Sequence, residues 1–504
     1  MITETPGLVT RHPARLDPDP TRVITKLFVP GEENPETRSR AAAVVGRVLA
    51  LPEDTVDALL AQVLADHDAR HRDFTVVLER NAAIMSHRLV DEDALSPARR
   101  LLLGAFFTHE YSVEAAALCN PSLVAHPSQD GLSPGELRVA LSLRGIGEGH
   151  LSSIGFATGV LGPGPVACWH PRTGPLTTAE RQPDSWGRGW FAAALAHDGC
   201  DNEITATVLS ALPEPFGQAD LDRGLAAVHP RLLARARAAA TVQRIRELTA
   251  AGYTVRFPGD TDLAQRVLWP TGAAESHGME DARFVRFTCA DGVTRYRATY
   301  TAYDGTTVAP HLLESDDLTS FRSFALTGPA ARNKGMALFP RLVGGRHLAL
   351  CRGDGETMSL SASPDGRIWA AEVPLHRPTA PWELLQVGNC GSPLETPLGW
   401  LVLTHGVGPM RTYAIGALLL DLADPARVIA ELPTPLLVPD AGARDGYVPN
   451  VVYSCGGLIH DDTLWLPYGS NDTRVAMASV PVAALLARMN FVTDEDRYNS
   501  EDPS

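Results

Sequence analysis

Residues 278–303 read GMEDARFVRFTCADGVTRYRATYTAY, and this stretch decides the fold class. The apolar side chains that follow Arg283 start a β-strand, and Asp291-Gly292 is a dipeptide typical of hairpin turns. Residues 296–303 then alternate between apolar and polar side chains as a returning strand. The stretch therefore predicts an antiparallel hairpin that begins with two adjacent carboxylates and an arginine.

Strand geometry separates the two carboxylates. Because successive side chains of a strand face opposite ways, we expect that Glu280 and Asp281 do not share one pocket, whereas Asp281 and Arg283 can. Asp281 is therefore the better candidate for a catalytic carboxylate, with Arg283 close enough to hold it ionised or hydrogen-bonded. A solvated strand end with a surface ion pair is the alternative that this stretch alone leaves open.

Short strands recur between turn signals along the rest of the chain. Strand clusters at about 253–313, 318–372, 383–430 and 436–487 return every 45 to 65 residues or so, which is the size of a four-stranded propeller blade. Residues 110–165 supply one more cluster. The sequence thus predicts a mainly β protein, a five-bladed β-propeller, whose functional site lies on the axis where the innermost strands converge.

Two helical regions interrupt this pattern. Residues 1–35 are rich in proline and are expected to be irregular, whereas apolar residues at helical spacing predict helices at 38–51, 53–67 and 230–251. The predicted organisation has five parts: a mostly helical region (1–108), a first blade (109–165), an insertion ending in a helix (166–250), the remaining blades (251–490) and a polar tail (491–504).

The composition limits the class of partner. A net charge of −15 argues against a nucleic-acid groove or an anionic membrane, because both need clustered Lys and Arg, and it is compatible with a neutral sugar. The seven cysteines are scattered and form no Cys-x-x-Cys pair, as expected of reduced thiols. Residues 1–30 carry no basic-then-apolar signal and no apolar run approaches a membrane span. We therefore expect a soluble, cytoplasmic protein.

Motifs for metal or serine chemistry are weak. The 16 histidines show no pair at metal-ligand spacing such as His-Glu-x-x-His, so we expect no metal and no cofactor. Residues 453–456 are similar to a nucleophile elbow, but Val452 occupies the position of its first glycine. Only Lys26 and Lys334 among the 44 basic residues are lysines, which hints that Lys334 serves a site needing a compact charge.

Five stretches, in this order, resemble one known family: residues 278–285, 300–305, 332–340, 388–396 and 399–408. The family is glycoside hydrolase family 130, which contains mannoside phosphorylases and β-1,2-mannosidases. The resemblance covers about residues 110–485 and is dense from 270 to 475. It implies a five-bladed propeller that acts on β-linked mannosides with inversion.

The resemblance also implies roles for individual residues. It makes Asp281 the general acid, and in this family the proton is thought to reach the glycosidic oxygen through a sugar hydroxyl, so that Asp281 need not contact that oxygen. For Tyr303 and Asp304 an ordinary strand-end turn is the alternative. The implied substrate-binding residues are Arg144, Tyr303, Asp304, Asn333, Lys334, Tyr413 and Asp472.

The phosphate site separates the two branches of the family. Arg332, Arg352 and His405 occupy places that match the phosphorylase cations, but Gln386 stands where those enzymes carry a lysine. Loss of a charge-assisted donor weakens a phosphate site. Glu356 and Glu395 bring carboxylates to the same motifs, where the resemblance to the hydrolase branch makes them candidates for activating water, with either one as the base.

The sequence therefore favours an inverting glycosidase, similar to the β-1,2-mannosidases, that releases mannose from manno-oligosaccharides. A β-mannoside phosphorylase is the first alternative, and a non-catalytic sugar-binding propeller is the second. The expected partner is the oligosaccharide, with no nucleic acid and no membrane. The role of the N-terminal helices stays open between covering the propeller, limiting substrate length and building a homo-oligomer.

Overall fold

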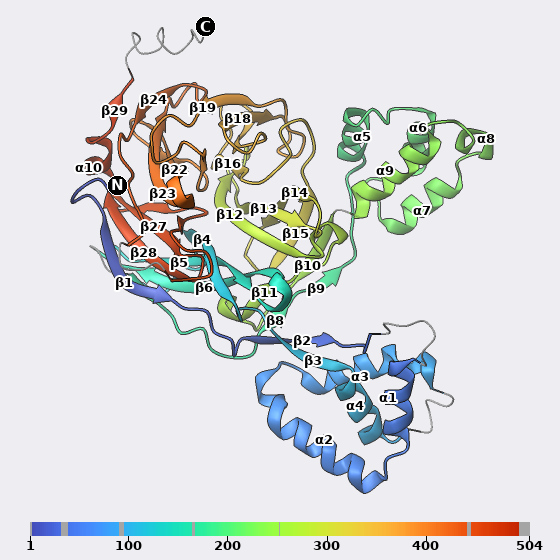
Figure 1. The fold of residues 1–504 in the computed structure, drawn as a ribbon. Coiled ribbons are helices and arrows are strands. Elements are labelled where there is room, and N and C mark those ends of the chain that lie inside the picture. Colours follow the sequence, from blue (N-terminus) through green and yellow to red (C-terminus); the bar gives the residue numbers. More distant parts are fainter. Residues whose placement is uncertain are drawn as a thin grey trace.

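The computed structural model describes residues 3–31, 39–89, 95–163, 167–250, 252–440 and 445–492. Figure 1 shows a ring of β-sheets from which two helical units project. Most of the predicted polar tail, from residue 493 on, lies outside the described residues. No helix in the described part of the chain is long and apolar enough to cross a membrane.

The first two blades are joined at the axis. Blade 1 contains β4 (Ala117–Ala125), β5 (Leu137–Ile146), β6 (Ser152–Leu161) and β7 (Ala167–Trp169). Blade 2 contains β12 (Gly278–Thr288), β13 (Thr294–Tyr303), β14 (Val308–Ser315) and β15 (Ser320–Ala325). Gly278 pairs in parallel with Ser152, and this single pair connects the two sheets.

Short strands extend these two blades on their outer sides. Strand β10 (Tyr253–Arg256) lies between β15 and β9 (Glu180–Gln182), and β11 (Arg266–Leu268) pairs with both β6 and β8 (Thr177–Thr178). The second blade was predicted at about 253–313, but its four strands occupy 278–325 and the strand at residue 253 is an outer addition.

The remaining blades follow in chain order. Blade 3 contains β16 (Ala337–Leu338), β17 (His347–Cys351), β18 (Met358–Ser363) and β19 (Val373–His376). Blade 4 contains β20 (Gln386–Asn389), β21 (Leu394–Thr396), β22 (Gly399–Gly408), β23 (Thr412–Leu420), β24 (Val428–Glu431) and β29 (Asn490–Phe491). Blade 5 contains β25 (Val452–Tyr453), β26 (Leu458–His460), β27 (Thr463–Ser470) and β28 (Arg474–Pro481), followed by helix α10 (Val482–Leu486).

The N-terminal segment completes the last blade. Strand β1 (Thr10–Leu16) pairs antiparallel with β28, so the first strand of the chain belongs to the same sheet as residues 474–481. The prediction of irregular structure over residues 1–35 is therefore wrong for this segment. The strand was missed because Pro13 interrupts its alternation, and the register shift between His12 and Arg15 accommodates that proline.

Apolar clusters show that the ring is closed. Phe156 packs with Phe284 between blades 1 and 2, and Leu312 shares a cluster with Leu338 between blades 2 and 3. The other three junctions are filled in the same way, by Leu350 with Trp400, Leu403 with Leu466, and Met477 with Leu141. Because each blade buries both faces against its neighbours, the fold is a five-bladed β-propeller, as predicted.

Two helical units stand outside the ring. The first contains α1 (Arg40–Leu49), α2 (Glu53–His67), α3 (Phe74–Ile84) and α4 (Pro97–Phe106), and the ribbon of β2 (Val23–Leu27) with β3 (Thr108–Ser112) connects it to the propeller. The second contains α5 (Arg188–His197), α6 (Glu203–Ala211), α7 (Gln218–Ala226), α8 (Pro230–Leu233) and α9 (Ala238–Ala250). The helix predicted over residues 230–251 is thus two helices, α8 and α9.

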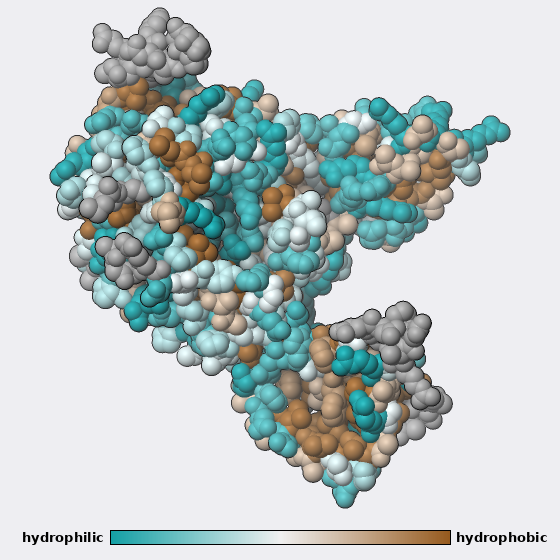
Figure 2. Space-filling view, viewed as in Figure 1, coloured by the Kyte–Doolittle hydropathy of each residue, from teal (hydrophilic) through white to brown (hydrophobic). Residues whose placement is uncertain are grey.

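Both helical units have their own apolar cores. Val45 of α1 packs with Leu103 of α4, and Phe191 of α5 packs with Ile245 of α9. Figure 2 shows hydrophobic side chains at the surface of the first unit, where Val76 and Phe106 are exposed, whereas the propeller face in this view is mainly hydrophilic. Because a sugar is polar, the hydrophilic propeller face suits the expected sugar-binding site better than the surface of the first helical unit does.

Candidate active site

A β-bulge sets the position of Asp281. The register between β12 and β13 shifts between Glu280 and Arg283, and Asp281 adopts a left-handed backbone with φ of 55°. A bulge inserts an extra residue and re-aims the side chains around it. The expectation that Glu280 and Asp281 point to different places is therefore wrong, because it assumed a regular strand.

Arg144 of β5 holds both carboxylates. Its Nη2 donates to Glu280 Oε1 over 2.6 Å, and its Nη1 donates to Asp281 Oδ1 over 3.1 Å. Lys334 Nζ donates to the other Glu280 oxygen over 2.6 Å. Glu280 is thus clamped between two cations, and the hint that Lys334 serves a charged site agrees with this contact.

Asp281 is buried but kept ionised. Asn120 Nδ2 of β4 donates to the same Oδ1 atom over 2.7 Å. Burial by itself raises the pKa of Asp281, but the positive charges of Arg144, Arg283 and Lys334 outweigh burial and hold the pKa below its ordinary value. In this state Asp281 carries a negative charge at neutral pH.

Arg283 connects three blades. Its Nη1 donates to the main-chain oxygen of Asp281 over 2.8 Å rather than to the carboxylate, and its Nε donates to the Cys390 carbonyl over 3.1 Å. Its Nη2 donates to the Tyr453 hydroxyl over 2.8 Å. Arg283 thereby fixes the bulge from behind and acts on the Asp281 carboxylate only through its charge.

His405 of β22 positions Arg352. Arg352 Nη1 lies 3.0 Å from His405 Nε2, and because arginine only donates, Nε2 accepts and the ring proton lies on Nδ1. Burial, with the charges of Arg352 and Arg283, lowers the pKa of His405 well below its ordinary value, so the imidazole is neutral. Gly388 permits this arrangement, since a Cβ there would lie 2.7 Å from the His405 ring.

Buried polar atoms without partners concentrate around this pair. Within the described residues, Arg352 Nε and both side-chain polar atoms of Asn389 have no hydrogen-bond partner, whereas the His405 ring is hydrogen-bonded to the Asn389 main chain. Buried polar groups are almost always paired in proteins, by other residues, water or ligands. The concentration of such atoms beside a cation indicates a place for a polar or anionic ligand.

Asn333 and Asp472 belong to the same region. Asn333 Nδ2 donates to the Arg352 carbonyl over 3.3 Å. Burial raises the pKa of Asp472 to about 6, the negative charge of Asp281 adds to the increase, and Arg144 opposes it. Tyr413 stacks on the His405 ring at 6.2 Å between centroids.

All five blades contribute to this group of side chains, which we call the axial cluster. Asn120, Asn333, Asp281 and Asp472 in the cluster have left-handed backbones, a conformation uncommon outside glycine and often found at functional sites. The axial cluster consists of Asn120, Arg144, Glu280, Asp281, Arg283, Asn333, Lys334, Arg352, Asn389, His405, Tyr413, Tyr453 and Asp472.

Glu395 lies elsewhere. It forms a two-point ion pair with Arg341, through contacts of 2.5 and 2.9 Å, and its side chain is 43% exposed. Strand β21 pairs Glu395 with Trp400 at the start of β22, whereas His405 lies near the other end of that strand. Glu395 therefore does not lie beside Arg352 and His405, where the resemblance to the hydrolase branch implied a water-activating carboxylate.

Three other predicted residues, Glu356, Arg332 and Asp304, are either exposed or bonded to residues outside the axial cluster. Glu356 is exposed in the turn that follows Arg352, and Arg332 is paired with Glu372 over 2.8 Å. Asp304 accepts hydrogen bonds from the main chain and hydroxyl of Thr306 and of Thr307, and these bonds lower its pKa.

Tyr303 is engaged in the same turn. Its hydroxyl donates to the Gly305 carbonyl over 2.9 Å, and its ring lies 6.0 Å from that of His277. The contacts of Tyr303 and Asp304 are therefore those of the ordinary strand-end turn that the sequence left open.

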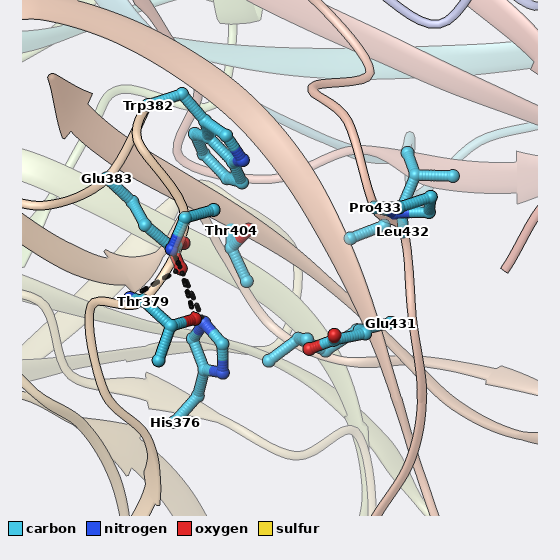
Figure 3. Close-up of a pocket in the computed structure, with 11 residues that line it drawn as sticks. His376, Thr379, Trp382, Glu383, Thr404, Glu431, Leu432 and Pro433 are labelled. Carbon is cyan, nitrogen blue, oxygen red and sulfur yellow. Dashed lines mark hydrogen bonds and ion pairs between the residues drawn. The ribbon is translucent and has the colours of Figure 1, made fainter. Parts of the chain in front are cut away.

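A separate cavity lies on the other side of β22. Figure 3 shows Thr404, Trp382, His376 and Glu431 around it, and Glu383 accepts hydrogen bonds from His376 and from residues 379–380. Its volume is about 40 Å³, which is room for water molecules rather than a sugar. Thr404 and His405 are successive residues with opposite orientations, so this cavity is separated from the axial cluster by the strand.

Several cluster residues were missed from the sequence. Asn120 could have been found from the sequence, because Asn-Pro inside a strand pattern indicates an irregular strand. The register between β4 and β5 does shift at this position. Glu280 was set aside on strand alternation, and Tyr453 was considered only as part of an elbow motif. Ser454 within that motif is fully buried and accepts from the Gly456 main chain, so it is not placed as a nucleophile.

A family model described as beta-1,4-mannooligosaccharide phosphorylase, of glycoside hydrolase family 130, matches residues 251–492. A 1,2-beta-oligomannan phosphorylase from Thermoanaerobacter sp. (strain X514) is 34% identical over 240 residues, which are 46% of this chain and 78% of the relative. A beta-1,2-mannobiose phosphorylase from Listeria innocua is 31% identical over 232 residues, which are 44% of this chain and 63% of the relative.

Among solved structures, the beta-1,2-mannobiose phosphorylase from Listeria innocua, in complex with beta-1,2-mannobiose, resembles the chain with a TM-score of 0.43 at 22% identity. That match covers 75% of this chain and 92% of the other. Sequence similarity of this extent identifies the family: the chain belongs to glycoside hydrolase family 130.

Proposed function

We propose that the chain is an inverting phosphorylase of β-1,2-linked manno-oligosaccharides. The single observation that supports it most is the set of unpaired buried polar atoms on Arg352 and Asn389, beside a carboxylate held by cations. Three relatives that are similar in sequence to this chain carry a β-1,2 name and are phosphorylases, which supports both the linkage and the reaction.

Arg352 is the proposed anion ligand. Its guanidinium is oriented by a neutral histidine that accepts from Nη1, and its Nε is left without a partner among the described residues. Arginine forms strong charge-assisted hydrogen bonds with phosphate oxygens. Across the axial cluster, four cations (Arg144, Arg283, Lys334 and Arg352) face three carboxylates (Glu280, Asp281 and Asp472), a balance that favours a bound anion.

The proposed reaction exchanges one bond for another. A phosphate oxygen attacks the anomeric carbon of the terminal mannose while the bond from that carbon to the glycosidic oxygen breaks. The leaving oxygen takes a proton from a sugar hydroxyl, which is replenished by Asp281. The products are α-mannose 1-phosphate and an oligosaccharide shortened by one residue, as inversion of a β-linkage requires.

The proton on Asp281 is proposed to depend on phosphate. Without a ligand, the surrounding cations hold the pKa of Asp281 below its ordinary value, which is unsuitable for an acid. A phosphate dianion near Arg352 and Arg283 offsets their charge and raises the pKa of Asp281. Binding of phosphate then prepares the acid as well as the nucleophile.

Hydrolysis is the second candidate, and Gln386 is the observation that favours it. A lysine absent from the phosphate site weakens anion binding, and Glu356, exposed in the turn after Arg352, is the remaining candidate base. Glu395 is less suited to that role, because Arg341 occupies both its oxygens.

All seven cysteines are free thiols, which supports the proposed cytoplasmic location.

The test is product analysis with β-1,2-mannobiose, with and without inorganic phosphate. The proposal predicts mannose 1-phosphate and mannose in the presence of phosphate, and no turnover in its absence. Free mannose at the same rate in both reactions overturns the proposal in favour of hydrolysis. Binding of mannobiose without any turnover overturns it in favour of a sugar-binding propeller.

A further inference from the structure

Two exposed side chains from different blades meet at the solvent side of the axial cluster. His150 lies in the turn between β5 and β6, and Tyr447 lies in the segment that precedes β25. The Tyr447 hydroxyl contacts His150 Nδ1, and the two ring centroids are 5.9 Å apart. We call this contact the His150–Tyr447 bridge.

Tyr447 is fixed to the turn that carries Asp472. The Tyr447 main-chain N–H donates to Thr473 Oγ1 over 2.7 Å, and the Val448 N–H donates to the Asn471 carbonyl over 3.1 Å. Both neighbours of Asp472 thus hold the segment. Burial raises the pKa of Tyr447, the charge of Arg144 opposes this increase, and the charges of Asp472 and Glu280 add to it, so the phenol lies within electrostatic range of the cluster.

His150 is fixed to the turn that supports Arg144. Arg144 Nε donates to Ser152 Oγ over 2.9 Å, two residues from His150. The Tyr111 hydroxyl of β3 donates to the Glu148 carbonyl of the same turn over 2.8 Å. His150 itself has a left-handed backbone with φ of 61°, a conformation that needs the support of its surroundings.

We propose that the His150–Tyr447 bridge is the wall that ends the donor-sugar subsite, so that a single sugar fits between it and the scissile bond. The inference rests on the proposed phosphorolysis. The leaving oligosaccharide varies in length and must extend into solvent, whereas the donor end can be closed. The bridge closes one end because its two side chains are in direct contact and both are anchored beside Arg144 and Asp472, two substrate-binding candidates that lie next to Asp281.

The test is the product formed from β-1,2-mannotriose and phosphate. Wild-type enzyme is expected to give mannose 1-phosphate and mannobiose. With the wall removed in a His150→Ala/Tyr447→Ala variant, a second sugar fits beyond the donor subsite, so mannobiose 1-phosphate and mannose appear. We expect the share of mannobiose 1-phosphate to rise at least about tenfold, measured by mass spectrometry of the sugar phosphates.

Further variants keep the test decisive. His170→Ala makes the same change in blade 1 at the far end of β6 and should leave the product pattern unchanged. If the double variant fails to fold, Tyr447→Phe and His150→Ala each replace it, with a smaller rise expected for each.

Active variants that give only mannose 1-phosphate overturn the inference while leaving the proposed function intact. A wild-type enzyme that forms no sugar phosphate from any manno-oligosaccharide overturns the proposed function and this inference with it.

Discussion

Asp281 and Glu395 are both paired with arginine, yet they lie in very different regions. Asp281 is 7% exposed, and its carboxylate is bound by residues of β4 and β5 although it belongs to β12. The Glu395 side chain is 43% exposed and contacts one exposed arginine. Along β22, the pairing partner of Glu395 is five residues from His405, or about 17 Å at ~3.3 Å per residue.

The difference teaches that a carboxylate–arginine pair indicates a functional site only when it is buried and has several bonding partners. An exposed pair is worth at most about 1 kcal/mol, whereas removing one partner of a buried pair costs about 3–5 kcal/mol. The axial cluster retains buried charges and unpaired polar atoms, which are costly to bury, and this is characteristic of a binding site rather than of scaffold.

The largest expected effect is that of Asp281→Asn. The amide keeps the shape of the side chain but has no proton to transfer, so kcat should fall by ~10²–10⁴. Steady-state rates of phosphorolysis measure the loss, and calorimetric titration with mannobiose should show that binding survives. Turnover near the wild-type value would show that Asp281 is not the general acid.

Arg352→Ala should have the next largest effect. The change removes the proposed phosphate ligand, and loss of a charge-assisted hydrogen bond of about 1.5–3 kcal/mol lowers kcat/KM for phosphate by roughly 10–150-fold. Arg341→Ala is the matched control, because it removes an arginine from the outer pair. Equal losses in both variants, measured at varied phosphate concentrations, would refute the anion site.

The propeller and most of the axial cluster could be predicted from the sequence, because local signals carry them. Turn residues and strand clusters predict blades, the strand pattern favours Asp281, and the resemblance of short motifs to a known family implies Arg352 and His405. Long-range pairing could not be predicted in this way: β1 joins β28 across nearly the whole chain.

The bulge at Asp281 is the second limit. It depends on the register of two strands, and nothing in the spacing of Glu280 and Asp281 reveals it. Glu395 was misplaced for a related reason, since motif order does not say which end of a strand faces the axis.

Asp472→Asn should change how stability depends on pH. The pKa of Asp472 is about 6 in the folded protein, above its ordinary value of 3.8. Because the folded pKa is the higher one, the protonated carboxyl stabilises the fold fully below about pH 4, and this contribution is lost as pH rises through 6. The free energy of unfolding of the variant relative to wild type should therefore rise by at most about 3 kcal/mol between pH 4 and 7.5.

Urea unfolding at several pH values measures this difference. Asp445→Asn, in the segment before β25, is the matched control for the general effect of replacing an aspartate by asparagine in this region. A profile for Asp472→Asn parallel to that of wild type would show that the carboxyl titrates normally.

The smallest expected effect is that of Glu395→Gln. An exposed pair contributes at most about 1 kcal/mol, so the free energy of unfolding should change by no more than that. Because Glu395 lies outside the axial cluster, kcat should stay within about twofold of wild type. A loss of activity comparable to that of Asp281→Asn would return Glu395 to the catalytic site.

The reverse reaction tests the central claim most directly. With α-mannose 1-phosphate and mannose as substrates, the account predicts release of inorganic phosphate and formation of a β-linked mannobiose. Wild type and Glu395→Gln should do this at similar rates, and Asp281→Asn should not. Hydrolysis of mannobiose by an enzyme that releases no phosphate from mannose 1-phosphate and mannose would contradict the account.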